Sequence, residues 1–360
     1  MRISIITPSY NQAAYLEKTI QSIISQGYDD LEYILIDGGS DDGSLKIIEK
    51  YKEHFAFWVS EKDEGQSHAI NKGFEKATGD IITWINSDDQ LTPNALHRIA
   101  AEFEKDVNKE IFVVHGKTIL FGENRSDKEF GASKTDFLER SLAGLPFPQP
   151  SSFFRKELIE KYGKVKQEFH FGMDYEFFIP VFLNEKSSYV DEIFSKYLYH
   201  NESKSLTQQS GFARDYAKVF SKILRSFEKN ATPQNQEIAK KTLSKFKELG
   251  FYTEQNHNFD KNITDNSMFE ITNPFTEMQL HLAFCYNLLN QLIFYYEAIE
   301  TKDKKEQVQS WKQVKKITSY LINNEPDFVA KNPEVKQVYQ RSKFLNPMLI
   351  GFLRKVKKVL

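Results

Sequence analysis

The clearest chemical feature of the chain is a pair of adjacent carboxylates, Asp88 and Asp89. The pair follows the apolar run Ile81–Ile85, which is typical of a strand buried at the centre of a sheet. Ligands of open α/β sheets bind outside the carboxyl ends of the strands, where this pair would lie. Neighbouring carboxylates repel each other unless a cation or hydrogen bonds offset the repulsion, and a hard divalent metal that carries a phosphate would do so. The alternative interpretation is a solvated turn in which an Asp caps the following helix.

A second pair of carboxylates, Asp174 and Glu176, lies in a strongly apolar stretch. Phe177 and Phe178 come directly after them and give the expected helix a face that packs into the core. An Asp at the start of a helix is ordinarily an N-cap or a partner of the helix dipole. The residues by themselves leave both that structural role and a chemical role open for Asp174.

Four apolar runs, each followed by polar or small residues, must position these groups. They alternate with three segments of helical spacing, an order typical of a right-handed, doubly wound, mostly parallel sheet. The expected strands are Ile3–Thr7, Leu31–Ile36, Phe55–Val59 and Ile81–Ile85, and the expected helices are Tyr15–Gln26, Ser44–Tyr51 and Ser67–Ala77. The four polar clusters should therefore meet at one edge of the sheet. Neither a Walker sequence nor a Gly-x-Gly-x-x-Gly follows the first strand, so the phosphates of a bound nucleotide would need a metal.

Beyond the carboxylate pair, Thr92 should cap a helix over Pro93–Phe103. Two further strands are expected at Ile111–Val114 and Thr118–Phe121. From about residue 211 the spacing becomes helical throughout. We therefore expect an α/β domain over residues 1–210 and an α-helical region over residues 211–360.

Four motifs, in this order, resemble those of the family 2 glycosyltransferases, which are inverting, metal-dependent enzymes with the GT-A fold. The motifs are Thr7-Pro8-Ser9-Tyr10-Asn11, Ile36-Asp37-Gly38-Gly39-Ser40-Asp41-Asp42-Gly43-Ser44, Asp63-Glu64-Gly65 with Ala69-Ile70-Asn71-Lys72-Gly73, and Gly79-Asp80 leading to Asn86-Ser87-Asp88-Asp89. The match covers about residues 3–94 and continues more loosely to about residue 207. It implies a GT-A (Rossmann-like) α/β fold, with residues 1–210 as the catalytic domain.

The resemblance implies which residues bind the donor nucleotide. Pro8, Tyr10 and Asp37 would line the base and the ribose, and Asp63 would close the same pocket. An Asp that accepts a hydrogen bond from a base N–H makes direct chemical sense. Asn71, in the third motif, is a further candidate for donor binding.

The resemblance also implies a divalent metal, Mg²⁺ or Mn²⁺. Asp88 would be the ligand from the Asp-x-Asp motif of the family, and Asp89 would share the metal or point toward the acceptor. His200 lies in a stretch similar to the family segment near the diphosphate or metal, whereas alone it would be read as a surface or hydrogen-bonded His. The chain departs from the family at Asn86, where the first Asp is usual. Asn keeps a carbonyl oxygen there but reduces the negative charge.

By the same resemblance Asp174 takes the position of the catalytic base, with Glu176 as the second candidate. Desolvation by the neighbouring Phe side chains would raise the pKa of Asp174 into a useful range. The implied reaction moves a sugar from a nucleotide-diphosphate sugar to a hydroxyl of a saccharide or lipid-linked acceptor, with inversion, in the assembly of a surface polysaccharide or glycolipid.

Two other functions stay open. A nucleotidyltransferase would be expected to carry a basic Gly-rich loop after the first strand, which this chain does not have. A catalytically silent binding or assembly module remains compatible with Asn86 and with the long helical region.

Composition narrows the function classes further. A formal net charge of −2 over 360 residues argues against nucleic acid as the main partner. The single cysteine, Cys285, excludes a disulfide framework and fits a reducing compartment. The start of the chain has no signal-peptide pattern, and no stretch approaches the roughly 20 apolar residues of a membrane span. We therefore expect a cytoplasmic protein.

The last segment, residues 344–360, joins an apolar run to four basic residues. Such a helix can lie in the surface of an anionic membrane, which would place the protein at the inner face. The alternative is a terminal helix that docks on its own domain.

Overall fold

The computed structural model describes residues 1–122, 126–131, 137–200, 209–230, 232–251, 269, 271, 275–299 and 303–344. The chain divides into two compact units. Unit 1 comprises Met1–Thr135 and Leu145–His200, and unit 2 comprises Asp136–Gly144 and Asn201–Leu360. Compared with the expected division at residue 210, unit 2 begins earlier and also takes in a short segment from the middle of the α/β part.

Unit 1 is built on four parallel strands near the N-terminus, in the order β3-β2-β1-β4. They are β1 (Ile3–Ser9), β2 (Leu31–Asp37), β3 (Phe57–Ser60) and β4 (Ile81–Trp84). The helices that connect them are α1 (Leu16–Ile24), α2 (Ser44–Lys50) and α3 (Gln66–Lys76). The expected alternation of strands and helices is confirmed. Ser9 pairs with Asp37 and Asp37 with Ser60, so the carboxyl ends of these strands lie at one edge of the sheet.

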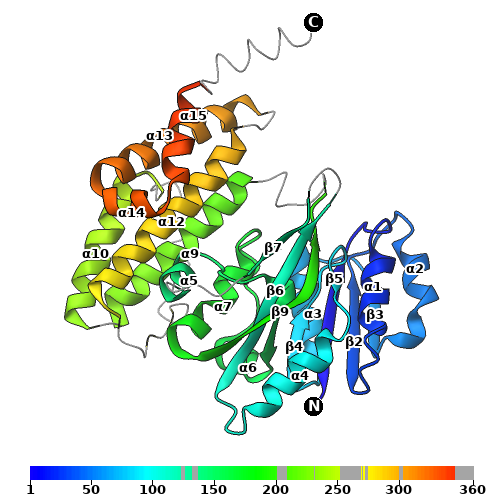
Figure 1. Ribbon diagram of the computed structural model, residues 1–360. Helices are drawn as coiled ribbons and strands as arrows, with labels where there is room; N and C mark the ends of the chain where they lie inside the picture. The colour runs from blue at the N-terminus through cyan, green and yellow to red at the C-terminus, as the bar shows by residue number, and fades with distance from the viewer. Residues whose placement is uncertain are drawn as a thin grey trace, which may run out of the picture. The chain divides into compact units, whose positions relative to one another are not determined.

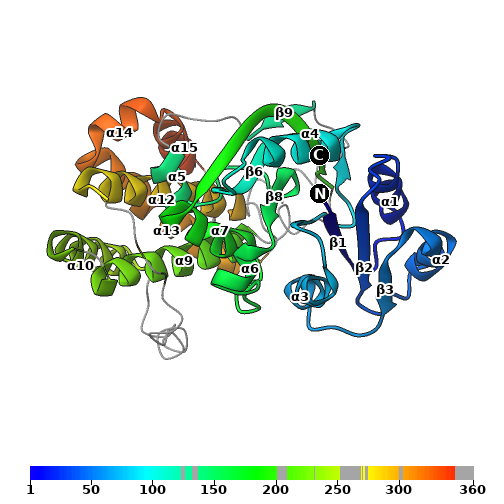
Figure 2. The same ribbon diagram turned by 90° about the horizontal axis from the view of Figure 1, so that it is seen from below.

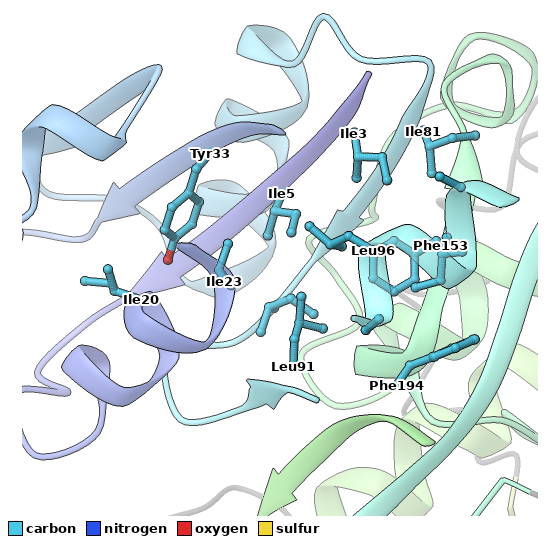
Figure 3. Packing of buried hydrophobic residues seen from close by; sticks show 14 of the residues in the cluster. Ile3, Ile5, Ile20, Ile23, Tyr33, Ile81, Leu91, Leu96, Phe153 and Phe194 are labelled. Atoms are coloured by element: carbon cyan, nitrogen blue, oxygen red, sulfur yellow. The ribbon is translucent and has the colours of Figure 1, made fainter. Parts of the chain in front are cut away.

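The strands alternate their side chains between two helical layers, which is why their sequences are apolar throughout. Ile3 and Ile5 belong to a core with Ile20 and Ile23 of α1 (Figure 3). Ile6, the residue after Ile5, faces α3 on the other side. A Cβ on Gly73 of α3 would lie 2.4 Å from Cγ2 of Ile6, so the missing side chain lets α3 lie directly on β1. Figure 2 shows α1 and α3 on opposite faces of β1–β3.

Beyond β4 the sheet becomes mixed (Figure 1). The strands β8 (Ser152–Arg155), β6 (Ile111–Phe121), β9 (Lys186–Leu198) and β5 (Gln90–Leu91) follow in that order, and β7 (Lys128–Phe130) pairs with β6. Only β6 and β9 among these neighbours run parallel. Two helices, α6 (Glu157–Tyr162) and α7 (Met173–Asn184), lie between β8 and β9 in the chain.

Two expectations for this region were wrong. The two strands expected between residues 111 and 121 form one long strand, β6, whose register with β9 shifts around Gly116. A Cβ on Gly116 would lie 2.7 Å from the carbonyl oxygen of Glu192, so the glycine allows β9 to pass close by without ending the strand.

The helix expected from Pro93 is α4 (Ala95–Lys105), and Thr92 does not cap it. The hydroxyl of Thr92 donates to the carbonyl of Ile193 at 2.5 Å, and its amide donates to the carbonyl of Phe194 at 3.0 Å. Thr92 therefore belongs to the contact with β9. The residue before α4 is Asn94, at a φ of 63°.

Unit 2 is helical over its described residues. Its helices are α5 (Phe137–Ala143), α9 (Gln209–Asn230), α10 (Pro233–Glu248), α12 (Glu277–Ala298), α13 (Lys304–Asn324), α14 (Pro326–Lys331) and α15 (Glu334–Phe344). Thr232 caps α10, and Thr276 with Gln279 forms a capping box at the start of α12. Within the described residues, none of the helices is long and apolar enough to cross a bilayer. The expected membrane-surface segment lies, apart from the last residue of α15, outside the described residues.

Candidate active site

Asp88 and Asp89 follow β4 as expected, but their surroundings differ. Asp89 is buried, with 1% of its surface exposed, and the Thr19 hydroxyl donates to its backbone carbonyl at 2.7 Å. Burial and the neighbouring Asp88 carboxylate raise the pKa of Asp89 well above its usual range. The Asp88 side chain keeps 23% of its surface exposed. Asp88 is therefore the carboxylate of the pair that a ligand from solvent can reach.

Asn86 connects this pair to α3. Its side-chain oxygen accepts from Nε2 of Gln66 at 2.8 Å, and its Nδ2 donates to Oδ2 of Asp89 at 3.1 Å. An amide can do both, whereas an aspartate could only accept. Asn86 thus orients the buried Asp89 and adds no charge beside it. The sequence did not indicate Gln66, whose only visible signal is its place at the start of α3, between the two parts of the third motif.

The Asn86 contacts lead to a first prediction, on stability. Asn86→Asp should lower the free energy of unfolding by about 1–3 kcal/mol, because it removes the donor to Asp89 and sets a carboxylate beside a buried one. Urea unfolding, followed by circular dichroism, measures this. Asn108→Asp, at an exposed turn position, is the matched control and should shift the midpoint little. Equal stability of the two variants would show that the Asn86 contacts are dispensable.

His200 lies beside Asp88, although 112 residues separate them in sequence. Its Nε2 is 3.1 Å from Oδ2 of Asp88, and its ring lies against that of Tyr15, with centroids 4.4 Å apart. Strand pairing explains this contact. The strand β5, just after Asp89, pairs with β9 near its end, and His200 lies two residues beyond β9. A carboxylate oxygen is the ligand type that Mg²⁺ and Mn²⁺ prefer, so Asp88 fits such an ion, and the imidazole nitrogen of His200 is a further donor beside it.

The expected nucleotide residues lie at the ends of β1, β2 and β3. Pro8 is buried within β1, whereas the Tyr10 ring just beyond β1 is 62% exposed. Asp37 is fully buried at the end of β2. Its carboxylate accepts from the amides of Gly39 and Ser40, at 3.1 and 2.9 Å, and from the hydroxyls of Ser40 and Ser60, at 2.6 and 2.7 Å. Through these contacts Asp37 fixes the loop after β2 at the edge of the sheet.

Asp63 and Asn71 occupy different surroundings. A Cβ on Gly38 would lie 2.8 Å from Oδ2 of Asp63, so this glycine lets the Asp63 carboxylate lie against the loop after β2. The other Asp63 oxygen accepts from the Gly65 amide at 2.8 Å. Asn71, on α3, donates from Nδ2 to the carbonyl of Val165 at 2.8 Å, which ties α3 to the loop that leads to α7. The structure therefore brings Asp63 to the ends of β2 and β3, whereas the contact of Asn71 is with the loop that leads to α7.

Asp174 is the second residue of α7 and does not cap the helix, because Gly172 holds the cap position. Its Oδ1 accepts from the Tyr175 amide at 2.8 Å. Desolvation by the surrounding protein raises the pKa of Asp174 to about 6. Glu176 is only 4% exposed, so Asp174 is the more accessible of the two carboxylates.

Contacts from α3 and β4 hold the start of α7 near the Asp88 loop. The Ser67 hydroxyl donates to Sδ of Met173 at 2.9 Å, while the preceding residue, Gln66, binds Asn86. Phe177 and Phe178 pack on Trp84 of β4, with ring centroids 5.7 and 6.2 Å apart. Gln66 thus contacts the loop that carries Asp88, and Ser67 contacts the residue before Asp174. The arrangement combines an accessible carboxylate, Asp88, with a second carboxylate, Asp174, whose pKa is raised.

Comparison with known proteins agrees with this fold. The model of the family described as "Glycosyl transferase family 2" matches residues 4–163. A Haemophilus influenzae protein, described as an uncharacterized glycosyltransferase, is 30% identical over 193 residues, which cover 52% of this chain and 74% of that protein. The GalNAc(5)-diNAcBac-PP-undecaprenol beta-1,3-glucosyltransferase of Campylobacter jejuni is 25% identical over 265 residues, which cover 70% of this chain and 82% of that enzyme.

A solved structure shows the same architecture. The mannosyltransferase PcManGT from Pyrobaculum calidifontis, in complex with GDP-Man and Mn²⁺, has a TM-score of 0.52 at 16% identity, covering 98% of this chain and 87% of that one. This likeness concerns the fold alone, and it confirms the expected GT-A class with a helical C-terminal region. Together with the family match and the relative from Haemophilus influenzae, it leads to one conclusion: this chain is a glycosyltransferase and belongs to glycosyl transferase family 2.

Proposed function

We propose that this glycosyltransferase moves a sugar from a nucleotide-diphosphate sugar to an acceptor hydroxyl and inverts the anomeric carbon. One observation carries the proposal. An accessible carboxylate beside an imidazole, Asp88 with His200, is linked through adjacent residues of α3 to Asp174, a carboxylate whose pKa is raised to about 6: Gln66 bonds Asn86 in the Asp88 loop, and Ser67 bonds Met173 beside Asp174. The first group suits a metal-bound diphosphate and the second suits proton abstraction from a hydroxyl.

The edge of the sheet would bind the nucleotide. The exposed ring of Tyr10 offers a face on which a base can stack, and Asp63 offers a carboxylate oxygen to the base or the ribose. Asp37 would act mainly by holding the intervening loop through its hydrogen bonds to Gly39, Ser40 and Ser60. Asn71 would contribute by keeping α3 in place.

Asp88 would hold the divalent metal, Mg²⁺ or Mn²⁺, with His200 at its side. When bound, such an ion offsets the negative charge that develops on the departing diphosphate. Asp89 would support the site from the protein interior, because it is buried and accepts a hydrogen bond from Asn86.

Asp174 would accept the proton of the acceptor hydroxyl. The hydroxyl oxygen would then form a bond to the anomeric carbon on the face opposite the diphosphate, while the bond from that carbon to the diphosphate oxygen breaks. A single displacement of this kind inverts the configuration. At neutral pH a group with a pKa near 6 is mostly deprotonated and still basic enough to take the proton, which is the balance that general base catalysis needs.

The name of one relative supports a proposal for the acceptor class. The name of the Campylobacter jejuni enzyme specifies a polyprenyl-diphosphate-linked saccharide. We infer that this chain likewise extends a saccharide, carried on a lipid at the inner face of the membrane, during assembly of a surface polysaccharide or glycolipid.

A panel of nucleotide sugars tests the proposed function. The purified chain is incubated with UDP-, GDP- and other nucleotide-linked sugars, with Mn²⁺, with Mg²⁺ or with EDTA, and release of the nucleoside diphosphate is measured. We expect release from one donor class that stops with EDTA. Formation of a nucleoside triphosphate and a sugar 1-phosphate when pyrophosphate is added would instead indicate a nucleotidyltransferase, and binding of the donor without any release would indicate a silent binding module.

Tyr10 provides a test of donor binding. Tyr10→Ala should weaken the affinity for the donor nucleotide by about 5–150-fold, because stacking of one base on an aromatic ring contributes about 1–3 kcal/mol. Tyr10→Phe keeps the ring face and should bind as the wild type does. Isothermal titration with the nucleoside diphosphate compares the three proteins. If the Ala variant binds normally, the base lies elsewhere.

A further inference from the structure

Unit 2 holds a cluster of three different metal-ligand side chains, far in sequence from the catalytic residues. His281 and Cys285 are one turn apart on α12, and Glu325 stands at the corner between α13 and α14. Nε2 of His281 is 2.9 Å from Oε2 of Glu325 and 3.9 Å from Sγ of Cys285. All three ligand atoms lie within 4.8 Å of one another.

The spacing is close to that of a zinc site. With Zn–N and Zn–O distances of about 2.0–2.2 Å and a Zn–S distance of about 2.3 Å, the ligand atoms of a tetrahedral site stand about 3.3–3.6 Å apart. The nitrogen and oxygen would move apart slightly, and the sulfur would move closer. His281 and Cys285 project from consecutive turns of one helix face, so rotamer changes suffice.

The surroundings of the three side chains would leave one coordination position of a bound cation open to solvent. Cys285 is buried, with 1% of its surface exposed, and Glu325 keeps 14% of its side chain exposed. His281 is at the surface, with 46% of its side chain exposed, which leaves room for a water as the fourth ligand. The Tyr320 hydroxyl donates to the other Glu325 oxygen at 3.4 Å and supports that carboxylate. Burial and the nearby Glu325 carboxylate raise the pKa of the Cys285 thiol, so without metal the thiol stays protonated.

The ligands come from the two elements that such an ion would join. Glu325 ends α13, where its amide donates to the carbonyl of Leu321 at 2.9 Å. Its own carbonyl accepts from Val329 in α14 at 3.0 Å. A bond to Glu325 therefore fixes the α13–α14 corner, and bonds to His281 and Cys285 fix α12 against it.

We propose that His281, Cys285 and Glu325 bind one Zn²⁺, with a water as the fourth ligand, and that the ion stabilises the helical unit. Binding displaces the thiol proton of Cys285 to solvent and requires the His281 ring to carry its proton on Nδ1. A thiolate together with an imidazole selects Zn²⁺ over Mg²⁺ or Mn²⁺, so this site differs in kind from the carboxylate site at Asp88. The contrasting interpretation is a hydrogen-bonded helix corner that binds no metal.

Cobalt substitution tests the site directly, because Cys285 is the only cysteine in the chain. The full chain, purified without a histidine tag and stripped with a chelator, is titrated with Co²⁺. We expect about one Co²⁺ per chain to produce a thiolate-to-cobalt charge-transfer band that Zn²⁺ abolishes, and Zn²⁺ should raise the melting temperature by about 2–8 °C. The band can arise only from Cys285.

Variants separate the two interpretations. Cys285→Ser should remove the band, and His281→Asn and Glu325→Gln should each weaken Co²⁺ binding at least about 10-fold. His54→Asn, an exposed histidine in unit 1, is the matched control and should change nothing. Asp88→Ala should keep the band, since that carboxylate belongs to the other site. The wild-type titration needs no variant to fold: if the wild type gives no charge-transfer band, or if His281→Asn and Glu325→Gln leave it unchanged, the zinc site does not exist.

Discussion

Asp174→Asn is expected to lower kcat by about 10²–10⁴-fold, the usual contribution of a positioned general base. The asparagine keeps the shape of the side chain and its acceptor for the Tyr175 amide, so α7 should remain in place. Donor binding should therefore stay close to that of the wild type. Steady-state transfer rates and nucleotide titration, run on the same preparations, measure the two effects separately.

The pH dependence gives this prediction a second readout. A base must be deprotonated to act, and the pKa of Asp174 is about 6. The wild-type rate should thus be constant above roughly pH 7 and fall about tenfold for each pH unit below 6. Residual activity of Asp174→Asn should lack this acid limb.

Two control variants make the result specific to Asp174. Asp327→Asn changes an exposed Asp in the first turn of another helix and should leave the rate unchanged. Glu176→Gln should lose less activity than Asp174→Asn, because Glu176 is buried. If Glu176→Gln is the variant that abolishes turnover and the acid limb, the roles of the two carboxylates are the reverse of those proposed.

Asp88→Ala is expected to lower turnover by about 10²–10⁴-fold, because offsetting the charge on a leaving diphosphate is worth several kcal/mol. Unlike Asp174→Asn, this variant should also change how binding of the nucleoside diphosphate responds to the metal. In the wild type, Mn²⁺ should strengthen binding of the nucleoside diphosphate, and in Asp88→Ala the affinity should be the same with Mn²⁺ or with EDTA. Isothermal titration in both conditions makes the comparison.

Asp29→Ala, at an exposed turn, is the control and should keep the metal-dependent affinity. In His200→Ala, the gain in nucleotide affinity with Mn²⁺ should lie between that of Asp29→Ala and that of Asp88→Ala, because the variant removes the neighbour of Asp88 but not the carboxylate itself. Retention of metal-dependent binding in Asp88→Ala would assign the metal to other ligands.

Local pattern was enough to predict the first half of unit 1. Apolar runs such as Ile81–Ile85, and the helix-spaced segments between them, indicate which residues will be buried. The alternation of strands and helices then predicts that the strands run parallel. The fold class and the convergence of the strand ends at one edge could therefore be expected. Asp174 could be singled out because its apolar neighbours are adjacent in sequence.

Contacts between distant parts of the chain could not be predicted in this way. No residue near Thr92 indicates that its hydroxyl and its amide will donate to carbonyls of β9, so the local signal for a helix start was misleading. The bond between Asn86 and Gln66, and the place of α5 in unit 2, likewise depend on tertiary packing. For His200, the family resemblance supplied what local pattern could not.

The stereochemistry of transfer tests the central claim most directly, since a single displacement with Asp174 as base permits only inversion. The enzyme is given an α-linked nucleotide sugar, and proton NMR follows the first sugar product, formed with the acceptor or with water in its place, before the anomers equilibrate. The mechanism proposed here predicts the β-anomer as the initial product, formed far more slowly by Asp174→Asn than by the wild type. An initial α-anomer would mean retention, and would contradict both the single displacement and the role of Asp174 as its base.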